Sequence, residues 1–175
     1  MSATIYFCTE NYIKSNTPIT ANVNWQEILP LVKYNSDAWL RKILGSYFYT
    51  DLLTKYNQQT LSADETYLVS LTQPSLAWRV AADSALELSF QIKNKGVMTQ
   101  SGDFSSNTEL KAIQFMYSKY VAKSEFTENM MIEWLIENKL LFSKFTDVLN
   151  KDSALYNRLC CSNTPNGFNS PIFLI

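Results

Sequence analysis

The sequence of 175 residues contains no histidine and only three cysteines. The lack of histidine removes the commonest general base, the commonest metal ligand and every Ser–His or Cys–His nucleophile. The cysteines, Cys8 and the adjacent Cys160 and Cys161, lack the Cys-x-x-Cys spacing of a structural zinc site. We expect free thiols in a reducing cytosol, the alternative being a strained disulfide between the two neighbours. These absences predict a protein that is not an enzyme and that binds no metal or other cofactor.

Glycine and charge are also scarce. Only four glycines occur, and no glycine-rich phosphate-binding motif is present. Charged residues make up 18% of the chain, against about 25% in an average soluble domain. The net charge is −1, without the basic excess of a surface that grips a nucleic-acid backbone. No apolar run approaches the ~18 residues that cross a bilayer, and the N-terminus does not resemble a secretion signal, so we expect no membrane association.

Aromatic residues, in contrast, are plentiful. They make up 14% of the chain, within a hydrophobic share of 46% that is ordinary for a folded protein. Interfaces between proteins favour aromatic residues and exclude charged ones. The composition therefore favours a protein that assembles with other chains.

The first helix is expected to begin near Asn24, which has capping-box spacing to Glu27. Apolar residues then recur at helical spacing as far as Ile43, although Pro30 lies inside the stretch and removes one backbone donor. Gly45 is expected to end this helix in the left-handed conformation that glycine enters freely.

Further helices follow the same kind of signals. We expect them over about 46–56, 62–71, 72–94, 106–121 and 127–145. Ser46 and Thr72 are candidate N-caps, and Pro74 falls in the first turn after Thr72, where a missing N–H costs nothing. Capping boxes of the form Ser-x-x-Glu open two others, at Ser62 and at Ser106.

The helix expected over 72–94 is predicted to lie at the centre of the bundle, because small side chains let other helices approach closely. Its mostly small face consists of Ala77, Ala81, Ala85, Leu88 and Ile92. Another stripe carries Arg79, Asp83 and Glu87, each four residues apart. This spacing indicates either an i,i+4 ion pair within the helix or a charge contact between subunits.

The predicted fold is mainly α, a compact bundle of about five helices with an extended N-terminal arm and an irregular or β-like C-terminal tail. Residues 1–22 have no helical period and form the arm, either extended over a neighbour or folded as a local strand. Residues 23–149 form the helical domain, with a flexible loop over 95–107. Residues 150–175 lose the helical period and form the tail.

The order of these features resembles that of the head–tail connector (adaptor or head-completion) proteins of tailed bacteriophages, most closely the versions from phages and prophages of Bacteroidota, including the crAss-like group. The resemblance covers about residues 20–150. Its parts are a long helix that closes on Ile43-Leu44-Gly45, an aromatic-x-x-Leu-Leu helix from Tyr49 to Leu53, the "LSADE" cap at 61–65, Gln73-Pro74 opening an alanine-rich helix, a loop with Gly96, and two helices that close with Phe142 and Phe145.

The resemblance implies a structural virion protein at the neck, assembled in the host cytoplasm. A ring of about twelve copies would sit between the portal protein and the tail or neck ring proteins. It would extend the channel through which double-stranded DNA passes without sequence-specific binding, and it would provide the surface where the tail docks. The helical bundle described above, the arm and an apolar C-terminus fit such a role.

The residues expected to contact neighbouring chains come from the arm, the charged stripe, the loop and the tail. They are Tyr6, Phe7, Tyr12, Arg79, Asp83, Glu87, Val97, Met98, Phe104, Phe168, Phe173, Leu174 and Ile175.

An alternative function is a small helical regulator that binds DNA or a polymerase. The two helices expected on either side of Gly45 could form a helix-turn-helix. Its second helix would then have to contact the DNA bases. That helix offers Lys55, Gln58 and Gln59, but it has no arginine and it carries Asp51. Its run of aromatic residues suits packing better than a DNA groove.

Overall fold

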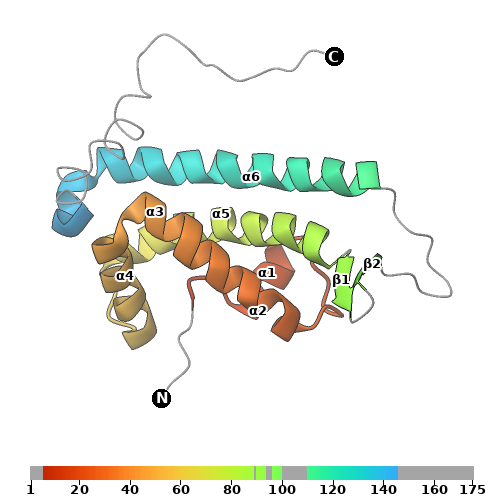
Figure 1. Ribbon diagram of the computed structural model, residues 1–175. Coiled ribbons are helices and arrows are strands. Elements are labelled where there is room, and N and C mark those ends of the chain that lie inside the picture. Colours follow the sequence, from red (N-terminus) through yellow and green to blue (C-terminus); the bar gives the residue numbers. More distant parts are fainter. Residues whose placement is uncertain (1–5, 89, 94–95, 100–109, 146–175) are drawn as a thin grey trace, which may run out of the picture.

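Helices make up most of the computed structural model, which describes residues 6–88, 90–93, 96–99 and 110–145 (Figure 1). The elements are α1 (Glu10–Asn16), α2 (Trp25–Tyr34), the π-helix η1 (Asn35–Leu40), α3 (Arg41–Leu44), α4 (Ser46–Gln58), α5 (Ala63–Glu87), β1 (Phe90–Lys93), β2 (Gly96–Thr99), α6 (Leu110–Glu137) and the short 3₁₀ helix η2 (Lys139–Leu141). The prediction of a mainly α fold is therefore confirmed.

Helix α5 lies at the centre of this arrangement, as its small apolar face predicts. The antiparallel helix α6 packs along one side of it, and α1, α2 and η1 contact it from other sides (Figure 1). Ala77 and Ala81 are buried and Ala85 is half-buried. Because these side chains are short, the neighbouring backbones approach closely, and the two longest helices form the framework that holds the others.

Helix α5 runs without interruption through Thr72 and Pro74, so the prediction of two helices over 62–71 and 72–94 is wrong. Its start is as expected: Ser62 and Glu65 form a complete capping box. Thr72 does not cap a new helix, because its hydroxyl donates to the carbonyl of Leu68 inside the helix. Proline lacks the N–H that would bond four residues back, to Ser70, and Ser70 is exposed, so water can satisfy its carbonyl.

Helix α6 is also continuous, where the sequence suggested separate helices over 106–121 and 127–145. Its buried side chains stay on one face across the expected break, from Tyr120 through Ser124 to Met131. The Ser124 hydroxyl donates to the backbone carbonyl of Ser75 at 2.9 Å, which ties the middle of α6 to α5. The capping box expected at Ser106 lies outside the described residues.

Gly45 separates α3 from α4 with φ of 76° and ψ of 146°. The positive φ is as predicted, but the ψ value differs from that of the left-handed helical cap expected there. Ser46 is the first residue of α4, and Gly45 occupies the N-cap position, where no side chain is present to cap. The expectation that Ser46 caps this helix is therefore wrong.

The segment between α2 and α3 forms a π-helix that no sequence signal indicated. Asn24 caps α2 as expected, accepting from the backbone N–H of Gln26 at 3.0 Å. Pro30 lies within α2, and the irregular backbone begins only at Asn35. The side-chain amide of Asn35 donates to the carbonyl of Leu31 at 3.0 Å and to a carboxylate oxygen of Asp83 at 2.7 Å. This tertiary contact gives the π-helix a partner on α5.

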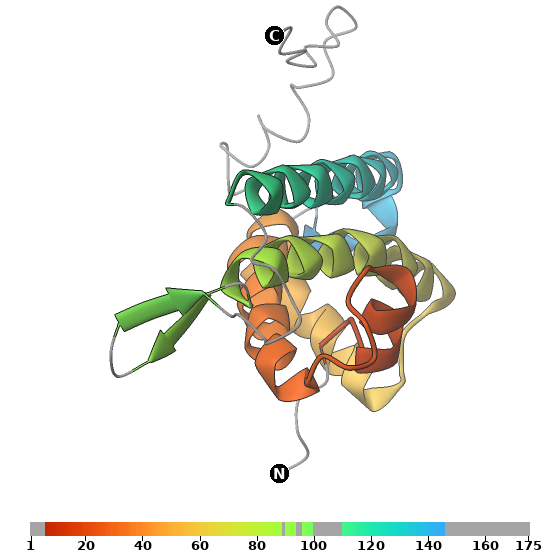
Figure 2. The same ribbon diagram turned by 90° about the vertical axis from the view of Figure 1, so that its right-hand side faces the viewer.

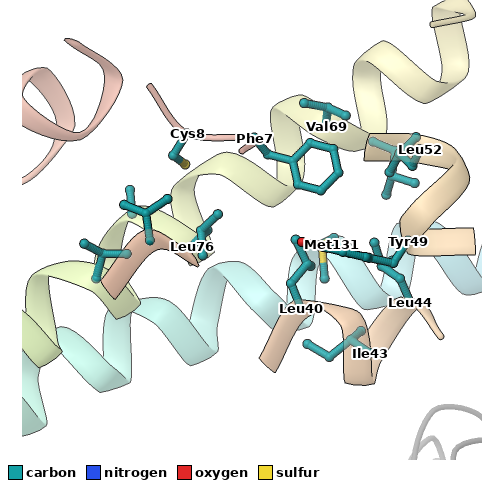
Figure 3. Close-up of a cluster of buried hydrophobic side chains, with 14 of the residues drawn as sticks. Phe7, Cys8, Leu40, Ile43, Leu44, Tyr49, Leu52, Val69, Leu76 and Met131 are labelled. Carbon is teal, nitrogen blue, oxygen red and sulfur yellow. The ribbon is translucent and has the colours of Figure 1, made fainter. Parts of the chain in front are cut away.

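The N-terminal segment is not an extended arm, at least from residue 6 onward. Helix α1 follows the N-cap Thr9, and its Ile13 side chain is buried in the main core. The side chains of Phe7 and Cys8 are buried in the same core (Figure 3). The carbonyl of Phe7 accepts a hydrogen bond from the Gln73 side chain at 2.8 Å. Because a helix of only seven residues carries little periodic signal, packing rather than local sequence decides this structure.

Strands β1 and β2 form an antiparallel hairpin that projects from the helical bundle at the end of α5 (Figure 2). Phe90 pairs with Thr99, and Lys93 pairs with Gly96. The fourth expected helix thus ends at Glu87 rather than near residue 94, and residues 96–99 form a strand where a flexible loop was predicted. Residues 100–107 of that loop and the tail over 150–175 lie outside the described residues.

Candidate functional site

The outward face of α6 carries a line of exposed side chains at helical spacing. This outer stripe consists of Phe115, Lys119, Ala122, Phe126, Met130, Glu133 and Glu137, all exposed. Phe115 is 69% exposed, Phe126 66% and Met130 49%, which is unusual for large apolar residues near each other on one helix. The opposite face of α6 is buried against α5, so nothing within the described bundle covers the stripe.

A second apolar surface lies at the end of the bundle where α6 ends and α4 begins. We call it the end patch: Tyr47, Tyr67, Leu140 and Leu141, with Leu140 87% exposed. It adjoins a group of rings in which the buried Phe142 contacts the buried Phe48 and the half-buried Trp134, with ring centroids 5.4 and 5.8 Å apart. Tyr67 contacts Trp134 with ring centroids 5.1 Å apart. The buried rings hold this end of α6 on α4, while the outer aliphatic and aromatic side chains face solvent.

A polar cleft of about 490 Å³ opens between η1, α5 and α6. Arg79 and Asp83, two of the expected interface residues, line it together with Trp39 and Glu128. The indole N–H of Trp39 donates to a carboxylate oxygen of Glu128 at 3.2 Å. Hydrogen bonds thus fix Asp83, through Asn35, and Glu128, through Trp39, on two walls of the cleft. This arrangement can accept a polar group from another molecule.

The charged stripe of α5 does not form the ion pair that its spacing suggested. Among the described residues, the ion pairs include none between Arg79 and Asp83. Asp83 instead accepts from Asn35. Partial burial, and then the negative charge of Asp83, raise the pKa of Glu87 above its ordinary value. Two like charges one turn apart are unfavourable within a helix, so the stripe does not serve to stabilise α5.

The other expected interface residues fall in three groups. Phe7 is fully buried within its own chain, which corrects the expectation that it contacts a neighbour, and Tyr6 and Tyr12 are half-buried beside it. Val97 and Met98 lie on β2 of the projecting hairpin. The remaining expected residues, Phe104, Phe168, Phe173, Leu174 and Ile175, lie outside the described part of the chain.

Neither the outer stripe nor the end patch was predicted from the sequence. A signal for the stripe was nevertheless present, since Phe115, Phe126 and Met130 share one side of a helix that runs over 110–137. The expected break between 121 and 127 hid this alignment, because residues in separate helices need not share a face. Leu140 and Leu141 follow the end of α6, within the range 127–145 that was expected to be one helix, and no local sequence signal shows that they face solvent.

Helix α4 offers few groups for binding DNA, although Gln58 and the following Gln59 are exposed. Phe48, Tyr49 and Leu52 are buried in the core. Lys55, its best candidate for a phosphate contact, pairs with Asp51 at 3.1 Å and with Glu65 at 2.5 Å. The interactions of these side chains therefore support packing of α4 rather than contact with DNA.

Within residues 6–88, 90–93, 96–99 and 110–145, no group of three His, Cys, Asp or Glu side chains lies close enough together to hold a metal ion. None of the helices in these ranges is both long and apolar enough to span a membrane. Cys8 is a free thiol, and burial raises its pKa well above the ordinary value. A thiolate is therefore strongly disfavoured at this position.

Part of this helical domain matches a known protein family. Residues 40–154, more than half of the 175-residue chain, match a family of unknown function, DUF6712. The chain belongs to this family. No curated protein and no solved structure matches the chain.

Proposed function

We propose that the protein is a structural subunit of the head–tail connector of a tailed bacteriophage, which forms a ring between the portal and the tail. In this role it extends the DNA channel and offers the surface where the tail docks. It acts without catalysis and without a cofactor. The virion neck is its location, and the portal protein and the tail or neck ring proteins are its partners. The proposal starts from the resemblance in the order of sequence features.

The observation that carries the proposal is the presence of two separate apolar surfaces on one small bundle. A closed ring uses a heterologous contact, in which one patch of a subunit meets a different patch of the next. The outer stripe of α6 and the end patch are two such surfaces, and they carry exposed phenylalanine, tyrosine, leucine and methionine. The hairpin that projects from α5 supplies a further contact beyond the bundle (Figure 2).

Electron microscopy of the purified protein, alone and mixed with the portal protein of the same genome, tests the proposal. We expect an added collar of density on the portal. Leu140→Asp should remove the collar, because it places a charge on a side chain that is 87% exposed and has no role in the core. Lys33→Ala, at an exposed position outside both surfaces, should leave the collar intact.

Bare portals with the wild-type protein would contradict the connector role. They would direct attention to the alternative of a regulator, tested by salt-dependent binding to DNA and by association with a polymerase. A collar that survives Leu140→Asp would show instead that the end patch is not part of the contact.

A further inference from the structure

The charges of α6 are separated along its length. Its first half carries lysine as the only charged residue type, at positions 111, 119 and 123, and its second half carries only glutamate, at 125, 128, 133 and 137. A helix is stabilised by acidic residues near its N-terminus and by basic residues near its C-terminus. Helix α5 follows this rule with Asp64 and Glu65 in its first turn, but α6 has the opposite arrangement.

Like charges also follow one another on the surface of α6. Lys119 and Lys123 are four residues apart, as are Glu133 and Glu137, and such pairs destabilise an isolated helix. In the part of the chain that the structure describes, neither Lys119 nor Glu133 forms an ion pair. The Lys123 ammonium lies over the Trp78 ring of α5, 3.8 Å from its centroid. Neither the stability of α6 nor an ion pair within the described bundle explains Lys119 and Glu133.

The outer stripe is symmetric about Phe126. Lys119 and Glu133 each lie seven residues from it, and Ala122 and Met130 each lie four residues from it. When two such helices pair in antiparallel fashion about a two-fold axis at Phe126, the lysine of each helix lies opposite the glutamate of the other. The small Ala122 lies opposite the long Met130. Spacings of three and four residues keep all of these side chains on one face of the helix.

We propose that the outer stripe of α6 binds the same stripe of a second copy of this chain in antiparallel orientation, with Phe126 at the two-fold axis and Lys119 opposite the partner's Glu133. Charge complementarity selects a second copy over an unrelated partner, because one stripe supplies both the basic and the acidic end. The contact buries three large apolar side chains that the bundle leaves exposed. It is isologous and uses the stripe that the proposed ring would use in a heterologous contact, so the pairing describes the free protein and has to open when a ring forms.

Charge exchange tests the pairing on the full-length protein, with the mass measured by sedimentation equilibrium over a range of concentrations. We expect the wild type to dimerise. Lys119→Glu and Glu133→Lys should each weaken the dimer by about tenfold or more, because two like-charge contacts replace two attractive ones. The double variant, and an equimolar mixture of the two single variants, should dimerise again. Lys33→Glu makes the same change of charge on α2, away from the stripe, and should have no effect.

Cross-linking tests the orientation. In a chain whose Cys160 and Cys161 are replaced by serine, Phe126→Cys should form a disulfide-linked dimer on mild oxidation, since both copies of position 126 meet at the axis. Phe115→Cys should not, because antiparallel pairing places it opposite position 137 of the other copy. Equal cross-linking of both variants would overturn the antiparallel arrangement.

A wild-type protein that stays monomeric at all concentrations would overturn the proposal, and so would single variants that dimerise as well as the wild type. In that case the stripe would be left to another partner, such as the portal or the C-terminal segment of the same chain. A charge-sensitive dimer together with bare portals would support the pairing and contradict only the connector role. A collar on the portal together with a monomeric free protein would support the connector role and contradict the pairing.

Discussion

Gly45 offers the sharpest test of how this chain folds. Its φ of 76° and ψ of 146° lie in a region that only glycine enters readily, since a Cβ there clashes with the backbone. Gly45→Ala should therefore lower the free energy of unfolding by about 1–3 kcal/mol. For a chain of this size each kcal/mol corresponds to roughly 2–4 °C, so the Tm should fall by about 2–12 °C.

The comparison with Gly45→Asn separates two explanations. Asparagine tolerates the left-handed helical conformation, so it would be nearly harmless if Gly45 were an ordinary helix cap. At a ψ of 146° asparagine has no such advantage, and it should be as costly as alanine. Gln59, with φ of 58° and ψ of 36°, is the matched control, because it is left-handed and not glycine. Gln59→Gly should be neutral or stabilising by up to about 1 kcal/mol.

Urea denaturation followed by circular dichroism gives the free energies, provided that the slope of each transition stays the same. A Gly45→Asn protein as stable as the wild type, beside a destabilised Gly45→Ala protein, would refute the conformation described for this junction. Wild-type stability in both variants would refute any requirement for glycine there.

The other predictions concern the N-terminal segment and pH. Phe7→Ala should cost about 3–5 kcal/mol in urea denaturation, because the ring is fully buried; a loss below about 1 kcal/mol would instead fit a segment that packs on a neighbour. Burial raises the pKa of Asp51, but hydrogen bonds from Lys144 and Lys55 outweigh it and hold the pKa below its ordinary value. The stabilisation is therefore complete above the ordinary pKa of about 4 and is lost as the pH falls through the folded-state pKa. Thermal melts at several pH values should show a shallower loss for Asp51→Asn than for the wild type, and equal slopes would contradict this role.

Local signals in the sequence determined several features of the fold. Ser62 and Glu65 form their capping box because both partners lie within one turn, and no distant contact is needed. Gly45 has the positive φ expected of it, since glycine alone pays no steric penalty there. The small face of α5 predicted a central helix, because close approach depends only on side-chain size.

Tertiary structure decided where helices continue and where they end. Thr72 and Pro74 have the residue types that are typical of a helix start. The packing of helices α5 and α6 against each other nevertheless favours one continuous helix over two short ones. The same packing carries α6 past the expected break near residue 124. Propensity differences of a few tenths of a kcal/mol per residue are small beside the burial of a long apolar face.

The candidate surfaces depended on tertiary structure for the same reason. The sequence shows that Phe7 and Phe126 are both aromatic, but it does not show which of them the bundle buries. Packing against Tyr49 and Tyr56 places Phe7 in the core, while Phe126 faces outward because the other side of α6 meets α5. The aromatic content of the sequence predicted assembly with other chains, but only the fold determines which aromatic side chains are exposed for such contacts.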